Sequence, residues 1–178
     1  MKKIDFKQWL PNIIAVVVFL ALTVIYFSPV VFDKKDLPQG DVASAQAWGK
    51  DLRDYHEKTG DYAYWSNTMF SGMPANYTYS PPTPNIFEYI SLVLRLDLNK
   101  LHLGIVFLYL IGFYILLMAL GVKPWLGIVG AIAYAFASYN LIIIDAGHVN
   151  KGLAMATMAP VIGGIILTHR KKYLIGIL

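Results

Sequence analysis

Four long stretches of the chain contain no charged residue, and they limit the fold more than any other feature of the sequence. These uncharged stretches are residues 8–32, 103–122, 124–144 and 152–168. A helix needs roughly 17 to 25 predominantly apolar residues to cross the hydrocarbon core of a bilayer. The sequence therefore predicts an all-α integral membrane protein with spans at about 9–32, 103–122, 124–144 and 152–168, of which the last is the shortest.

The composition agrees with this class of protein. Hydrophobic residues make up 57% of the 178 residues, charged residues make up only 15%, and the mean hydropathy is +0.52. Such a chain is too apolar for a soluble domain of this size. The absence of cysteine excludes disulfides, thiol catalysis and thiolate metal sites. The net charge of +4 comes without a basic patch interleaved with aromatics, so we expect no nucleic-acid partner.

The positions of lysine and arginine indicate how the predicted spans are oriented. Basic residues lie before the first span, between the second and third, and after the fourth: Lys2, Lys3, Lys7, Lys123, Arg170, Lys171 and Lys172. In the long segment 33–100, by contrast, acids outnumber bases. Because cytoplasmic loops are enriched in Lys and Arg, we expect a cytoplasmic N-terminus and an outer loop at residues 33–100.

The two ends of the chain require separate interpretation. Ala43-Ser44-Ala45 has the small-x-small pattern of a signal-peptide cleavage site, but it lies well beyond the end of the first apolar run. That run also exceeds the usual length of about 7 to 15 residues, so we expect an uncleaved first span. Residues 173–178 look like the beginning of a fifth span, and we therefore expect residues 1–178 to be the N-terminal part of a single, longer polytopic domain.

The outer loop is too long to lack structure of its own. Apolar residues from Val42 to Tyr55 recur at helical spacing, which predicts a helix along the membrane surface with Asp41 as its N-cap. Residues 86–98 predict a second interfacial helix that leads into the second span.

The charged residues of the first loop helix have simple structural interpretations. An N-cap aspartate stabilises a helix by about 1 kcal/mol, and Asp41 needs no other role. The later acids of this helix alternate with Lys50, Arg53 and Lys58, which predicts a solvated, ion-paired face.

Small residues predict close contacts between the spans. They recur every four or eight positions in the third and fourth uncharged stretches: Gly127, Ala131, Ala135, Gly152, Ala156 and Gly164. This is the spacing at which neighbouring helices approach closely in membranes.

Several of these residues also resemble a known family. The first span is followed by Gln39-Gly40-Asp41, then by Gln46, and then by the stretch YWSNTMFSGMP at residues 64–74. This order is similar to the N-terminal region of the YfhO-type bacterial membrane proteins, which belong to the GT-C superfamily of polytopic glycosyltransferases. The later Gly147-His148-x-x-Lys151 resembles a pattern of some members.

The resemblance implies a GT-C-like polytopic fold in the bacterial cytoplasmic membrane, with two membrane-parallel helices in the outer loop. It implies transfer of a sugar from a polyprenyl-phosphate carrier to an envelope polymer or glycolipid acceptor on the outer face. A complete member is several times longer than this chain, so we expect the 178 residues alone to be inactive.

The resemblance also assigns roles to particular residues. It places the catalytic acid at Asp41, whose carboxylate would take a proton from the acceptor hydroxyl. The predicted topology places His148 and Lys151 on the same side as Asp41, where their chemistry suits them to bind the lipid phosphate and stabilise its charge as it leaves. The alternatives are a snorkelling Lys151 with a headgroup-facing His148, or an ion pair between Lys151 and Asp145.

The aromatic part of the outer loop is a candidate groove for binding the acceptor. The candidate groove residues combine aromatic faces for sugars with amides for hydroxyls: Gln46, Trp65, Asn67, Met73 and Tyr77. The alternative is an ordinary packed loop. No metal-ligand cluster or certain cofactor is apparent, although a divalent cation at Asp41 stays an open alternative.

A second class of function competes with the transferase. The chain could belong to a non-enzymatic polytopic membrane protein, either a transporter of lipid-linked material or an assembly subunit. A transporter is expected to hold ionisable groups or broken helices at mid-membrane. The uncharged spans favour a site at the outer face instead.

Overall fold

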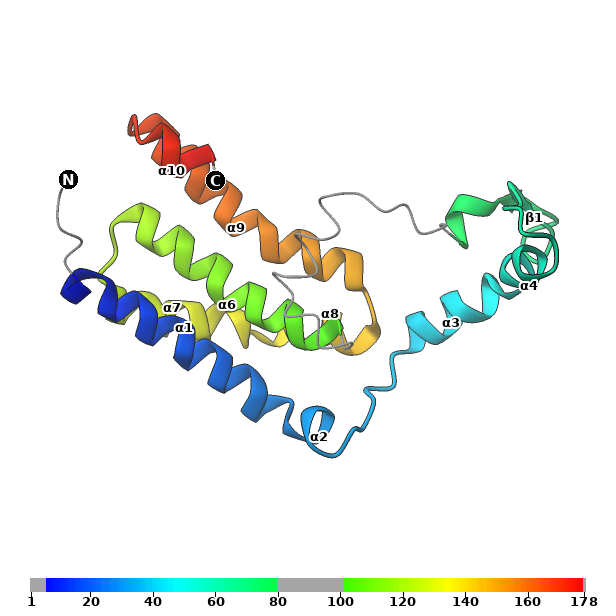
Figure 1. The fold of residues 1–178 in the computed structure, drawn as a ribbon, viewed down its shortest axis with the longest axis horizontal. Helices are drawn as coiled ribbons and strands as arrows, with labels where there is room; N and C mark the ends of the chain where they lie inside the picture. The colour runs from blue at the N-terminus through cyan, green and yellow to red at the C-terminus, as the bar shows by residue number, and fades with distance from the viewer. Residues whose placement is uncertain (1–5, 80–100, 178) are drawn as a thin grey trace.

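The protein is mostly helical and consists of a helical bundle with an extension of short elements at one end (Figure 1). The structure, a computed structural model, describes residues 6–79 and 101–177. Its helices and strands in chain order are α1 (Phe6–Tyr26), α2 (Ser28–Val31), α3 (Gly40–Trp48), α4 (Lys50–Thr59), β1 (Trp65–Ser66), β2 (Met73–Pro74), η1 (Ala75–Tyr77), α6 (Leu101–Leu120), α7 (Pro124–Ala135), α8 (Ser138–Ala146), α9 (Val149–His169) and α10 (Tyr173–Ile177).

Helix α6 forms the centre of the bundle, where it packs against α9, α7 and α1. Its side chains Ile105, Val106, Tyr109 and Leu110 are almost completely buried. On the α1 side, the Tyr114 hydroxyl donates a hydrogen bond of 2.7 Å to Asn12 Oδ1. Within a bilayer the lipid is as apolar as these side chains, so close packing and such hydrogen bonds hold the helices together.

Glycines allow α6 and α9 to approach each other closely. A Cβ atom at Gly112 would lie 2.6 Å from the Ala156 carbonyl oxygen, too short for any side chain. The predicted small-residue faces are confirmed at Gly127, Ala131, Ala135, Gly152 and Ala156, which are all buried.

Gly164 is also in a close helix contact, as its spacing predicts, but its partner is α10 and not α6. Gly163, not Gly164, continues the buried face of α9, and it lies against Ala119 and Leu116 of α6. Gly164 instead faces Gly176 of α10, whose carbonyl oxygen would lie 2.7 Å from an added Cβ atom.

Among the described residues, two helices are long and apolar enough to cross a membrane, namely α1 over Trp9–Tyr26 and α9 over Val149–His169. The predicted first span is too long, because α1 ends at Tyr26 and a separate short helix follows. The fourth stretch, expected to be the shortest span, forms one of the two long helices. The apolar part of α6, Gly104–Leu120, is shorter than these.

The third predicted span is a bent helix pair rather than one straight helix. Helices α7 and α8 meet at an angle of 47° and would count as a third span if they cross the membrane together. The buried side chain of Asn140 supports the bend, because its Nδ2 donates a hydrogen bond of 2.7 Å to the Tyr134 carbonyl oxygen. Such a side chain satisfies backbone groups that a continuous helix would have paired.

We expect Asn140→Ala to destabilise the protein, because it leaves the Tyr134 carbonyl without this donor. The Tyr134 carbonyl still accepts a hydrogen bond of 3.2 Å from the Ala137 N–H, so the loss is that of one ordinary hydrogen bond, about 0.5–1.5 kcal/mol. Thermal unfolding of the detergent-solubilised protein measures the effect. The control is Asn76→Ala, at an exposed position of η1. Equal melting temperatures for the two variants would show that Asn140 does not support the bend.

The two ends of the bundle differ in charge. One end holds the start of α1, the α6–α7 turn and the α9–α10 turn, at the left in Figure 1, and carries Lys7, Lys123 and residues 170–172. Within the described ranges, the carboxylates lie instead at residues 33–61 and at Asp145, on the segments that join α2, α3, α4 and α8 at the other end.

The extension contains two helices where one was expected. Gly49 separates α3 from α4, and a Cβ atom there would lie 2.9 Å from the Thr78 carbonyl oxygen. Helix α3 begins at Gly40 with Gln39 as its N-cap, so the prediction of Asp41 as N-cap is wrong. The second loop helix predicted at 86–98 lies outside the described residues.

Candidate functional site

The beginning of α3 is held against the turn between α8 and α9. Gln39 Nε2 donates a hydrogen bond of 2.5 Å to the Ile144 carbonyl oxygen. Next to it, Gly147 ends α8 in the left-handed conformation, with φ +89°, and lies against Gln39 and Val42. We call these contacts the α3–α9 junction, because they fix the first turn of α3 beside the first turn of α9.

The junction brings two of the predicted site residues into contact. Asp41 lies in the first turn of α3, and its Oδ2 is 3.1 Å from Nδ1 of His148, the N-cap of α9. Both side chains are about half exposed, at 57% and 50%. An ion pair this accessible to water adds little stability, at most about 1 kcal/mol.

A cavity of about 600 Å³ opens beside this pair. Its walls are residues 147–151 at the start of α9 and the α3 side chains Asp41, Val42 and Gln46, with Arg53 reaching in from α4. Its volume is in the range of small-molecule sites. The cavity therefore unites Asp41, Gln46, His148 and Lys151 from the predicted site residues.

The fixed charges of this cavity favour an anion. Lys151 and Arg53 supply two permanent cations against the single carboxylate of Asp41. Lys151 Nζ lies 5.1 Å from the centre of the Tyr139 ring of α8, a cation–π contact outside the cavity lining that restrains the ammonium. Asp145 lines a different cavity, and the described residues show no ion pair between Asp145 and Lys151.

The sequence interpretation missed the role of Arg53. Its surface neighbours behave as expected, since Lys50 and Asp54 form an exposed ion pair of 3.1 Å. The Arg53 guanidinium instead donates a hydrogen bond to the Gln46 carbonyl oxygen and faces the cavity. The sequence offered no signal for this difference, because it depends on the break at Gly49.

The remaining candidate groove residues lie elsewhere. Trp65 and Met73 belong to the small hairpin, in which Trp65 pairs with Pro74 and Ser66 with Met73. Asn67 is exposed in the hairpin loop, and Tyr77 is 73% exposed on η1. None of these four lines the three cavities described in this structure. Their placement agrees with an ordinary loop.

The described residues contain no group of three or more His, Asp or Glu side chains that could hold a metal ion. Asp41 offers one carboxylate, and its Oδ2 already contacts His148. A divalent cation at Asp41 would therefore need most of its oxygen ligands from water or from a substrate phosphate.

Comparison with protein-family models, with curated proteins and with solved structures finds no match to this chain. The functional argument therefore rests on the cavity beside Asp41 and His148.

Proposed function

We propose that this chain forms the outer-face site of a membrane glycosyltransferase that moves a sugar from a polyprenyl-phosphate carrier to a cell-envelope acceptor. The observation that carries the proposal is the 3.1 Å contact between Asp41 and His148 at the wall of a cavity that also holds Lys151 and Arg53. The cavity wall therefore combines a carboxylate that can accept a proton with cations that can bind a phosphate.

The transfer requires an acid–base group and a site for the leaving phosphate. The acceptor hydroxyl attacks the anomeric carbon and forms the new glycosidic bond, while its proton goes to the Asp41 carboxylate. The bond between the anomeric carbon and the phosphate oxygen breaks, and the lipid phosphate keeps the electron pair. Lys151, Arg53 and a ring N–H of His148 stabilise that developing negative charge.

The membrane location supports the same assignment. The apolar helices α1 and α9 fit a membrane protein, and the basic end of the bundle fits the cytoplasmic side of a bacterial membrane. The α3–α9 junction lies at the opposite end, where a donor on the outer leaflet would present its phosphate. This arrangement agrees with the N-terminal part of a GT-C-like polytopic fold, which the YfhO-type resemblance implies.

We expect single cysteines at Lys50 and Lys123 to react differently with a membrane-impermeant maleimide on intact cells, because α4 lies at the acidic end and Lys123 in the α6–α7 turn. Lys50→Cys should be labelled and Lys123→Cys should be protected until the cells are opened. The chain has no cysteine of its own, so the background is zero. The reverse pattern would overturn the orientation and the proposed site with it.

A direct assay tests the proposed transfer itself. Membranes from cells that produce a full-length polytopic protein containing this chain should move sugar from a polyprenyl-phosphate donor, and this activity should require the Asp41 carboxylate. Sugar transfer at the unmodified rate without that carboxylate would contradict the assignment.

The rival proposal is a transporter of lipid-linked material or an assembly subunit. The bend between α7 and α8 favours it, because transporters build their sites at broken helices. The bend, however, is filled by buried Asn140, and the polar cavity lies at the end of the bundle. Flux of a lipid-linked sugar across proteoliposome membranes without sugar transfer would support the rival.

A further inference from the structure

Tyr139 lies in the first turn of α8, next to the lysine of the candidate site. The distance of 5.1 Å between Lys151 Nζ and the centre of the Tyr139 ring is within the limit of about 6 Å for attraction between an ammonium and an aromatic face. The ring does not line the cavity beside Asp41, whereas Lys151 does. Tyr139 therefore contacts a residue of the site from outside the cavity.

The bend between α7 and α8 gives Tyr139 this position. Helix α7 packs against α6, whereas α8, turned by 47° from α7, packs against α9. Asn140 is buried, and its side chain is fixed by the hydrogen bond to the Tyr134 carbonyl oxygen. Because neighbouring residues of a helix point about 100° apart, a buried Asn140 leaves Tyr139 on an exposed face of α8. The ring then meets Lys151 in the first turn of α9.

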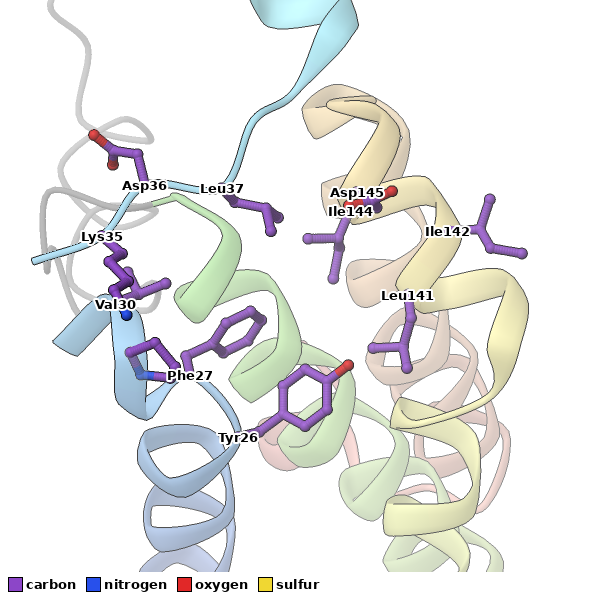
Figure 2. A pocket seen from close by; sticks show the side chains of 11 residues that line it. Tyr26, Phe27, Val30, Lys35, Asp36, Leu37, Leu141, Ile142, Ile144 and Asp145 are labelled. Carbon is purple, nitrogen blue, oxygen red and sulfur yellow. The ribbon is translucent and has the colours of Figure 1, made fainter. Parts of the chain in front are cut away.

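The Lys151 ammonium is not neutralised by a carboxylate of the described residues. Asp41 contacts His148 instead. Asp145, the acid nearest to Lys151 in the sequence, lies at the wall of a separate cavity of about 540 Å³, together with Leu37 (Figure 2). Within residues 6–79 and 101–177, Lys151 forms no ion pair. Its positive charge is therefore available to an anion in the cavity beside Asp41.

The aromatic contact improves Lys151 as a ligand for such an anion. A lysine side chain loses rotamer freedom when it binds an anion, and the lost conformational entropy weakens the complex. A contact that already restrains the ammonium before binding removes part of this loss. The Tyr139 ring covers only one side of the ammonium, so its other N–H donors can still reach a phosphate.

We propose that Tyr139 is a positioning residue for the lipid phosphate, because its ring holds the Lys151 ammonium where the phosphate binds. The bend between α7 and α8 then serves the site, since it brings the ring against α9. The proposal rests on the proposed function, because it takes the anion at Lys151 to be the phosphate of the lipid carrier. It differs from a snorkelling Lys151, whose ammonium would have only water and lipid head groups as partners.

The test measures the binding of farnesyl phosphate, a short isoprenyl monophosphate, and of uncharged farnesol. It uses equilibrium dialysis of a purified full-length polytopic protein containing this chain, in a neutral detergent. Tyr139→Leu should weaken the binding of farnesyl phosphate by about twofold to fivefold, the contribution of one solvent-accessible cation–π contact. Tyr139→Phe keeps the aromatic face and should bind like the unmodified protein. Neither substitution should change the binding of farnesol.

A double-mutant cycle shows whether Tyr139 acts through Lys151. Lys151→Gln removes the ammonium, so Tyr139→Leu should cause no further loss in that background. Tyr64→Leu is the matched control, because Tyr64 is 89% exposed and lines none of the three described cavities. It should leave binding unchanged. Tyr139→Gln, with a polar side chain at the same exposed position, replaces Tyr139→Leu if the leucine variant does not fold.

Three results would overturn the proposal. They are unchanged binding of farnesyl phosphate by Tyr139→Leu, equal losses in the leucine and phenylalanine variants, and a further loss from Tyr139→Leu in the Lys151→Gln background. The expected binding without any sugar transfer would contradict the proposed function and leave Tyr139 as a positioning residue for an anion. No preference of the unmodified protein for farnesyl phosphate over farnesol would overturn both.

Discussion

Replacing Asp41 with Asn is expected to lower sugar transfer by roughly 10²- to 10⁴-fold, the contribution typical of a general base. Asn keeps the size of the side chain and a polar oxygen, but it removes the negative charge and nearly all basicity. The rate is measured in membranes from cells that produce a full-length polytopic protein containing this chain, with polyprenyl-phosphate-linked sugar as the donor. The membrane level of each variant is measured in parallel.

The position of Asp41 in α3 lets the experiment distinguish a catalytic acid from a helix cap. Asp41 lies inside the first turn of α3 and makes no cap hydrogen bond, so Asp41→Asn and Asp41→Ala should be similar in stability. Each loses an acid near a helix N-terminus, which is worth about 0.3–1 kcal/mol. If Asp41 were the cap, only the alanine variant would be destabilised.

Asp54→Asn provides the matched control for Asp41→Asn. Asp54 forms an exposed ion pair with Lys50 at 3.1 Å, the same distance as between Asp41 and His148, but outside the cavity. The control should transfer sugar at the unmodified rate. Near-normal transfer by Asp41→Asn would remove this carboxylate from the mechanism and leave the Asp41–His148 pair as a structural contact.

The sequence predicts a helical membrane protein because a long uncharged stretch is stable in few structures other than a membrane-spanning helix. Bends within such a stretch are harder to predict. Residues 124–144 are almost uniformly apolar, and the break between α7 and α8 contains neither proline nor glycine. The one available signal is Asn140, a polar side chain whose partner lies only six residues earlier, at Tyr134. A side chain of this kind in an apolar stretch suggests a backbone group that needs a donor.

The candidate site is predicted less completely than the fold, because it depends on long-range contacts. Gln39 and Ile144 are 105 residues apart, and their hydrogen bond sets the position of Asp41 beside His148. The charge asymmetry of the sequence predicts that Asp41 and His148 lie on one side of the membrane. It does not predict that they contact each other. The sequence pattern predicts one helix from Asp41 to Lys58 with Arg53 on its solvated face, whereas the break at Gly49 turns Arg53 toward the cavity.

Replacing Gly147 with Ala is expected to lower sugar transfer by up to roughly 10²-fold, since a displacement of 1 Å in a catalytic arrangement can have that effect. Gly147 has φ +89°, and a Cβ atom there would lie 3.0 Å from Val42 Cγ2 and 3.1 Å from Gln39 Cβ. The first turn of α3 must therefore give way by a few tenths of an ångström, which makes 10²-fold the upper limit of the effect. Asp41 moves with it and separates from His148, while neither side chain is altered.

Gly121→Ala isolates the effect of that shift from the cost of the backbone conformation. Gly121 has φ +88°, and nothing lies within 4 Å of the added Cβ atom. Both variants place alanine in the left-handed region, at a cost of about 1–2 kcal/mol. Thermal unfolding should therefore show a loss in each, whereas transfer should fall only in Gly147→Ala. Equal transfer by the two variants would show that the α3–α9 junction does not position the reacting groups.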